Sequence, residues 1–238
     1  MAMLNELMDT KVYQLVTERL TPASEGEQGQ PIDMNPALIE QILDLYSKDE
    51  DYPIEKMRAF SMEEILNYLQ ATHRYYLTKK LPEIEQSLVH IFSKYGQSHQ
   101  LLASLAYFFN AYKENLIAHI RMEEKEFFPY IRQLIALSKD EASNAKRPEK
   151  FDIQHFMDSH SPIEDELQEV STLIKRYSSA DEPMPLPYKI FLNQVEIFEI
   201  ELRKHAIIED HVLVPMALEL EKTFFGTSNT YSERSPSQ

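Results

Sequence analysis

Two stretches of the chain each place a histidine four residues before a glutamate and ten residues before a proline: HIRMEEKEFFP and HAIIEDHVLVP. The pair is His119 and Glu123 in the first stretch, and His205 and Glu209 in the second. Residues four apart on an α-helix lie on one face, about one turn from each other. Each stretch therefore predicts an imidazole and a carboxylate that point the same way, and two copies indicate one shared site.

Imidazole and carboxylate groups together form a ligand set of nitrogen and oxygen atoms. The 238 residues include no cysteine, which excludes disulfides, thiolate nucleophiles, cysteine-ligated zinc and cysteine-ligated iron–sulfur clusters. Histidine and glutamate suit iron, manganese or zinc, and a pair of carboxylates can bridge two metal ions. The sequence therefore predicts a metal site without sulfur ligands.

The composition narrows the classes of partner. The formal net charge is −15, and we expect no nucleic-acid partner because phosphate binding needs clustered Lys and Arg. No run of about 18 apolar residues is present, so we expect no membrane-spanning helix. The first residues lack a basic segment followed by an apolar one, which is the pattern of a signal peptide. We therefore expect a cytoplasmic protein.

Helical periodicity dominates the chain, which has only 4 Gly. Ser61 and Glu64 have the spacing of a capping box and open the first long helix, in which Pro82 predicts a kink or short break near residues 78–82. Three more long helices are expected over about 100–137, 152–178 and 187–222. Long helices joined by short turns predict an all-α fold, an antiparallel up-down four-helix bundle.

The expected domains are three. Residues 1–60 form a small helical N-terminal appendage with a short amphipathic helix over 35–47 and a linker over 21–31. Residues 61–222 form the bundle, and residues 223–238 form a disordered tail.

Helix lengths bring two more histidines to the repeated pairs. His160 precedes His205 by 45 residues, and His73 precedes His119 by 46. About 18 residues rise along one helix, eight to ten turn, and about 18 return, so each pair ends at one level of the bundle. We therefore expect His73, His119, His160 and His205 to converge from four helices, with Glu123 and Glu209 one turn away.

We expect the remaining titratable residues near these motifs to have roles other than the six main ligand positions. Four histidines are expected to be structural or exposed: His90, His99, His155 and His211. Glu164 shares a face with His160 and could be an extra ligand, an orienting group or a solvated glutamate. Glu124 and Asp210 point away from the ligand face and could orient their neighbours.

These motifs carry a family resemblance. HIRMEEKEFFPYI resembles the H-x-x-x-E-E-x-x-(L/F)-F-P element of hemerythrin-like (HHE cation-binding) domains. The repeat, with THRYYLTKKLPEI and MDSHSPIEDEL, is more specifically similar to the RIC proteins, for repair of iron centres, over about residues 62–220. The resemblance implies two non-haem iron ions bridged by the two glutamates, with manganese or zinc as other occupants of such a site. The implied ligands are His73, His119, Glu123, His160, His205 and Glu209.

The resemblance also implies a role in the response to nitric oxide or oxidative stress. Proteins of this kind are thought to bind or process O2, NO or peroxide, or to supply iron to an acceptor protein. Two alternatives stay open: a module that binds or senses O2 without catalysis, and a metal-free helical scaffold. The sequence departs from the family pattern at three points. Arg74 stands where the first-helix histidine often does, Tyr95 replaces a common histidine, and the N-terminal cysteine pair is missing.

Overall fold

The structure is a computed structural model that describes residues 34–48, 52–95, 100–139 and 185–225, with Ile153, Phe156 and Thr172 between them. Within these ranges every regular element is a helix, so the predicted all-α fold is confirmed. None of the described helices is both long enough and apolar enough to cross a membrane.

The first long helix begins as the sequence predicts. The Glu64 N–H donates to Ser61 Oγ at 3.2 Å, and the Ser61 N–H donates to Glu64 Oε2 at 2.9 Å, which closes the capping box. The structure describes three long helices at length, and each of them contains one π turn between two α-helical parts. The elements are α3 Met62–Tyr75, η3 Tyr76–Lys80, α4 Leu81–Tyr95, α5 Gln100–Met122, η4 Glu123–Phe127, α6 Phe128–Lys139, α9 Leu186–Ile208, η6 Glu209–Leu213 and α10 Val214–Phe225.

A proline follows each π turn at the same distance. Pro82, Pro129 and Pro215 each lie six residues after the first residue of the π turn before them. Proline has no N–H to donate, and inside an α-helix its ring clashes with the carbonyl four residues earlier. A π turn, with its wider i→i+5 hydrogen bonds, lets the helix continue past such a position. The irregularity expected near Pro82 is therefore a π turn at residues 76–80.

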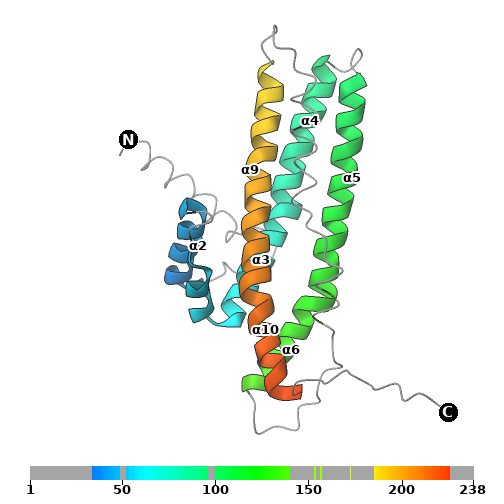
Figure 1. Cartoon of the computed structure of the whole chain (residues 1–238). Helices are drawn as coiled ribbons and strands as arrows, with labels where there is room; N and C mark the ends of the chain where they lie inside the picture. The colour runs from blue at the N-terminus through cyan, green and yellow to red at the C-terminus, as the bar shows by residue number, and fades with distance from the viewer. Residues whose placement is uncertain are drawn as a thin grey trace, which may run out of the picture.

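Among the described residues, buried side chains form two hydrophobic cores, one between the helices in the upper part of Figure 1 and one between those in its lower part. The upper core joins α4, α5 and α9 through residues such as Tyr76, Ile84, Phe109 and Phe198. The lower core joins α3, α6 and α10 through residues such as Leu66, Phe128, Leu134 and Leu213. The π turns lie where the two cores meet.

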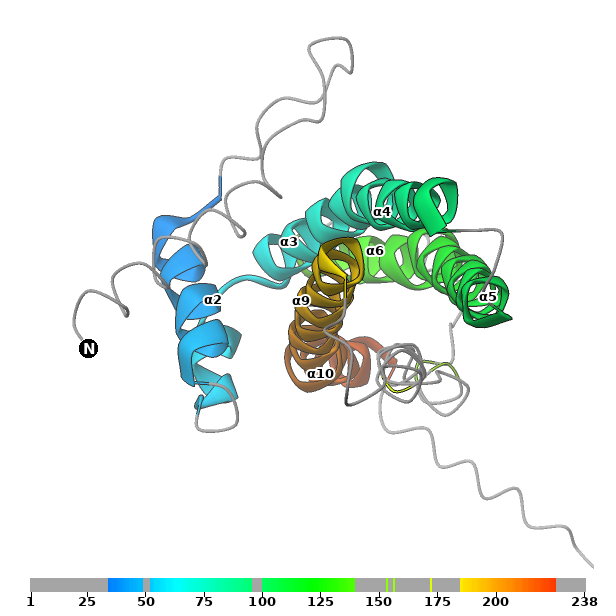
Figure 2. The same ribbon diagram turned by 90° about the horizontal axis from the view of Figure 1, so that it is seen from above.

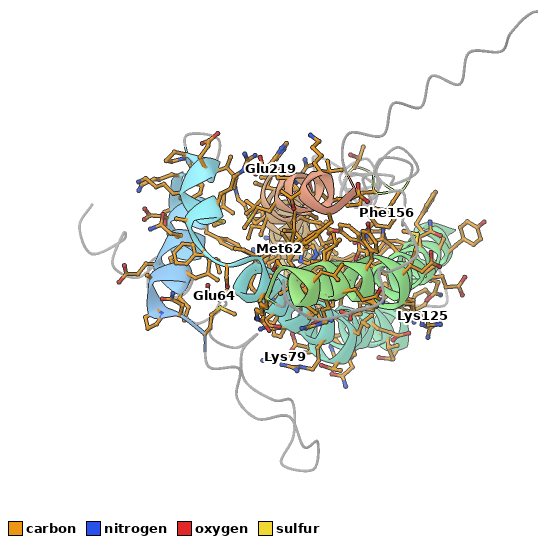
Figure 3. The ribbon with its side chains drawn as sticks, turned by 90° about the horizontal axis from the view of Figure 1, so that it is seen from below. Met62, Glu64, Lys79, Lys125, Phe156 and Glu219 are labelled. Carbon is orange, nitrogen blue, oxygen red and sulfur yellow. The ribbon has the colours of Figure 1, made fainter. Side chains whose placement is uncertain are left out.

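The N-terminal helix α2 Pro36–Lys48 lies beside the lower half of the bundle (Figures 1 and 2). It is followed by a 3-10 helix, η2 Ile54–Ala59, and both bury apolar side chains in the lower core: Leu38, Ile42, Leu45 and Met57. The Asn35 Nδ2 donates to Glu64 Oε1 at 3.0 Å, and Figure 3 shows Glu64 on the side of α3 that faces α2. The division of the chain at residue 60 stays a prediction.

Several sequence predictions concern parts of the chain outside the described residues. Of the expected third helix, Ile153 and Phe156 are helical and buried in the lower core, and the Phe156 ring stacks on Phe127 at 4.5 Å. His160 and Glu164 lie outside the described residues, as do the linker and the tail beyond Phe225, where α10 ends.

Candidate metal centre

Three of the predicted ligands meet between the two cores. His73, Glu123 and His205 are buried, and one ligand atom from each lies within 4.8 Å of the others. They come from α3, the first residue of η4, and α9, which are far apart in the sequence. The helix-length reasoning for His73 therefore agrees with its position in the structure.

The other two described ligands extend this cluster into a continuous chain of contacts. Glu123 Oε1 lies 2.8 Å from His119 Nε2, and Glu123 Oε2 lies 3.1 Å from His73 Nε2. The two Nε2 atoms of His73 and His205 are 3.0 Å apart, and His205 Nε2 lies 3.6 Å from Glu209 Oε2. Five of the six predicted ligands are thus brought together, and the sixth, His160, lies outside the described residues.

The chain of contacts is closer to solvent at one end. The side chain of His119 is 15% exposed, whereas that of His73 is 3% exposed and that of Glu123 is fully buried. Aromatic rings line the inner part: Phe128 stacks on the His73 ring at 5.3 Å, and Tyr76 meets the His205 ring edge-on at 5.8 Å. The site is therefore a buried polar cluster in which His119 is more exposed than His73 and Glu123.

Thr72 sets the tautomer of His205. Its hydroxyl lies 2.7 Å from the Leu69 carbonyl oxygen, which can only accept, so the single hydroxyl proton is donated there. Thr72 Oγ1 also lies 2.7 Å from His205 Nδ1 and must accept from it. His205 Nδ1 thereby carries a proton, and Nε2 of the same ring faces Glu209 and His73. Ligating histidines are commonly oriented in this way by a partner of the other ring nitrogen.

Glu124 orients the ring of His73 in a similar way. Its Oε1 accepts from His73 Nδ1 at 2.9 Å, while His73 Nε2 lies between Glu123 and His205. Because His73 Nε2 and His205 Nε2 lie 3.0 Å apart, one of the two must carry a proton and donate it to the other. Burial lowers the pKa of His73, but its hydrogen bonds to Glu123 and Glu124 and their charges outweigh burial and raise the pKa above its ordinary value. A metal ion at Nε2 would have to displace that proton.

A chain of polar side chains holds Glu124 in turn. The Gln70 Nε2 donates to Glu124 Oε2 at 2.8 Å, and Arg132 donates to Gln70 Oε1 and to Asn67 Oδ1, the latter at 3.1 Å. The sequence suggested that Glu124 could orient a neighbour, and the structure gives it that contact. Neither Gln70 nor Arg132 could be found from motif spacing, because both belong to the site only through the packing of α3 against α6.

The sequence reasoning also missed a buried charged pair one turn from the site. Glu201 is 1% exposed and its Oε1 lies 3.1 Å from Lys80 Nζ, while Lys204 is buried nearby on α9. Glu201 precedes His205 by four residues, so an E-x-x-x-H-x-x-x-E pattern was available in the sequence. His90 and His211, expected to be structural or exposed, are both exposed.

The donor set fits a metal ion of the iron, manganese or zinc class. The described groups are imidazole nitrogens and carboxylate oxygens, all within a largely apolar shell, and Nε2 of His205 faces the cluster. Burying two carboxylates among aromatic rings is costly unless opposite charge compensates them. A bound cation would supply that opposite charge.

Comparison with known proteins gives the same family as the motifs. A family model described as the hemerythrin HHE cation binding domain matches residues 64–217. An iron-sulfur cluster repair protein ScdA from Staphylococcus epidermidis is 21% identical over 154 residues, which are 64% of this chain and 65% of that protein. The ScdA of Staphylococcus haemolyticus is 20% identical over 176 residues, 74% of this chain and 75% of that protein.

The match spans 65% of the length of the S. epidermidis relatives. No solved structure matches the chain. The family match covers more than half of the chain, including every described residue of the contact cluster. The protein therefore belongs to the hemerythrin HHE cation-binding domain family, and its fold is an all-α hemerythrin-like bundle.

Proposed function

We propose that the protein is a non-haem di-iron protein of the cytoplasm that takes part in the repair of iron centres under nitric oxide or oxidative stress. The observation that carries this proposal is the continuous contact chain from His119 to Glu209, buried and anchored on three long helices. The names of the relatives support iron over manganese or zinc, and repair over other roles.

The residues that would hold the two ions are His73, His119, Glu123, His160, His205 and Glu209. Glu123 is suited to a bridging position because its two oxygens already contact different histidines, Oε1 with His119 and Oε2 with His73. We assign the second bridge to Glu209, the residue at the same place in the repeat. Both glutamates are the first residue of a π turn, a local geometry that is frequent at functional sites.

When bound, non-haem iron supplies coordination positions at which O2, NO or peroxide can bind. The surrounding residues do the rest. His119 lies at the more exposed end and provides the approach, while Tyr76 and Phe128 keep water from the inner histidines. Iron held by His73 and His205 would displace the proton between their Nε2 atoms, so loading and unloading of iron would be linked to proton transfer at these atoms.

Repair by this protein would have to proceed without thiols of its own, since its sequence contains no cysteine. Iron for an acceptor protein would then leave directly from the histidine and glutamate site. The partner class that we propose is a protein with a damaged or empty iron–sulfur site, and the small-molecule partners are O2, NO and peroxide.

A transfer experiment tests this function. The reduced, iron-loaded protein is mixed with an apo iron–sulfur acceptor, sulfide and a chelator that captures free iron. We expect cluster formation in the acceptor at a rate that the chelator leaves unchanged, because iron passes between the proteins. A rate that falls to that of free iron would contradict donation.

Reaction with NO separates the open alternative, an O2-binding or sensing module. We expect single-turnover mixing of the reduced protein with NO to consume NO with release of a product. A stable adduct without product would favour the binding module.

A further inference from the structure

The second copy of the repeat, residues 205–215, accepts hydrogen bonds from a residue that lies outside the bundle helices. Arg58, on η2, donates from Nη2 and Nε to the carbonyl oxygen of His211, at 3.0 and 3.3 Å. His211 lies within η6, the π turn that begins at Glu209. The guanidinium therefore binds the backbone of the turn that carries a proposed ligand, 153 residues away in the sequence.

Pro215 explains why this carbonyl needs a donor. In an α-helix the N–H of residue 215 would donate to the carbonyl four residues earlier, which is that of His211, but proline has no N–H. In the π turn the Val214 N–H donates instead to the Glu209 carbonyl, five residues earlier. Backbone carbonyls are obligatory acceptors, and Arg58 supplies the donor that the helix lacks at this point.

The element that carries Arg58 is itself fixed. Met57, the residue before it, is fully buried in the lower core, which also contains Val212 and Leu213 of η6. Phe60 closes η2 by donating its N–H to the Met57 carbonyl at 3.2 Å. Both partners of the contact between Arg58 and the His211 carbonyl thus belong to elements that pack in the lower core.

We propose that Arg58 is a positioning residue for the metal centre, and that η2 of the N-terminal segment acts as a clamp on the π turn that presents Glu209. This inference rests on the proposed metal-binding function. Glu209 is the first residue of that turn, so the position of its carboxylate, whose Oε2 lies 3.6 Å from His205 Nε2, follows the path of the turn's backbone. The clamp gives the N-terminal segment a role at the site that needs no cysteine.

Equilibrium binding of Co²⁺ to the metal-free protein, followed by its absorption bands, tests the clamp. Three variants are compared with the unmodified chain: R58A, R58K and K56A. Lys56 is the matched control, because it is an exposed cation of the same 3-10 helix. We expect R58A to weaken one of the two binding steps by about three- to tenfold, which is the lower range for a charged hydrogen bond because this one is exposed, and to change the absorption bands of that ion. R58K should recover part of both, and K56A should bind as the unmodified chain does.

Hydrogen exchange in the metal-free protein provides the second readout. We expect R58A to speed exchange of the amides of Glu209–Leu213 and to leave those of Glu123–Phe127, the same turn in the first copy, unchanged. Unchanged Co²⁺ binding with faster exchange would show a merely structural contact and overturn the positioning role. An equal loss in R58A and K56A would overturn it as well, since charge alone would then explain the effect. If the unmodified chain takes up no metal, the proposed function fails, and the exchange comparison still decides whether Arg58 holds the turn.

Discussion

The two copies of the repeat have the same spacing and different supports. In the first, Glu123 contacts two histidines at 2.8 and 3.1 Å, and its own neighbour, Glu124, orients His73. In the second, Glu209 contacts His205 at 3.6 Å, and the orienting groups come from elsewhere: Thr72 on α3 and Arg58 on η2. Identical motifs thus place the ligands, while the surrounding fold decides how firmly each is held.

The largest effect should come from removing each glutamate charge in turn. Glu123 joins His119 to His73, so E123Q is expected to abolish binding of both ions, whereas E209Q should abolish binding of at least one. Iron content per chain after reconstitution measures this difference. Unchanged iron content in E209Q would show that the second copy is not part of the site, and equal residual binding in both variants would remove the asymmetry between the copies.

The orienting residue of the first copy should follow in size. E124A leaves His73 Nδ1 without its carboxylate, and loss of such a partner weakens metal binding by about 10- to 100-fold. E126A, which removes an exposed charge from the same π turn, is the control and should bind metal as the unmodified chain does. Chelator competition gives both affinities, and equal values would show that Glu124 acts only through long-range charge.

The orienting residue of the second copy should matter less, because Thr72 offers His205 an uncharged hydroxyl whereas Glu124 offers His73 a carboxylate. T72V keeps the shape of the side chain but removes the acceptor for His205 Nδ1–H, and we expect metal binding to weaken by roughly tenfold. T72S keeps the hydroxyl and should restore binding. If T72V binds metal as tightly as T72S and the unmodified chain do, the hydroxyl does not orient His205.

The smallest effect should be the pH dependence that His73 confers on the metal-free protein. Its pKa is raised in the fold above the ordinary value of 6.5, so its stabilising contribution is complete below that pH and is lost as pH rises through the folded pKa. Metal binding should change in the opposite direction and tighten with rising pH, because the proton on Nε2 must leave. Urea midpoints of the unmodified chain and H73Q across this range measure the first effect. If the urea midpoints of the unmodified chain and H73Q change with pH in the same way, His73 is not the source of this pH dependence.

Much of the fold follows from local sequence signals. The capping box at Ser61 and the apolar periodicity predicted where the long helices lie, because both depend on neighbouring residues. The distance of 46 residues from His119 pointed to His73, although Arg74 holds the usual family position, and the structure places His73 beside Glu123.

The supports of the site could not be predicted in the same way. A π turn adds one residue to a helical turn and leaves almost no mark on a pattern with period 3.6, although the recurring proline is a usable sign of it. Thr72 and Arg58 become part of the site only when α3 and η2 pack beside α9 and η6, and nothing in their local sequence indicates that contact.

The central claim is that the histidine and glutamate cluster holds two iron ions. Elemental analysis of the protein after anaerobic reconstitution with Fe²⁺ and removal of loosely bound metal tests it most directly. We expect two iron ions per chain in the unmodified protein and fewer in E209Q. Iron well below one per chain would contradict the di-iron assignment and leave the bundle as a metal-free scaffold.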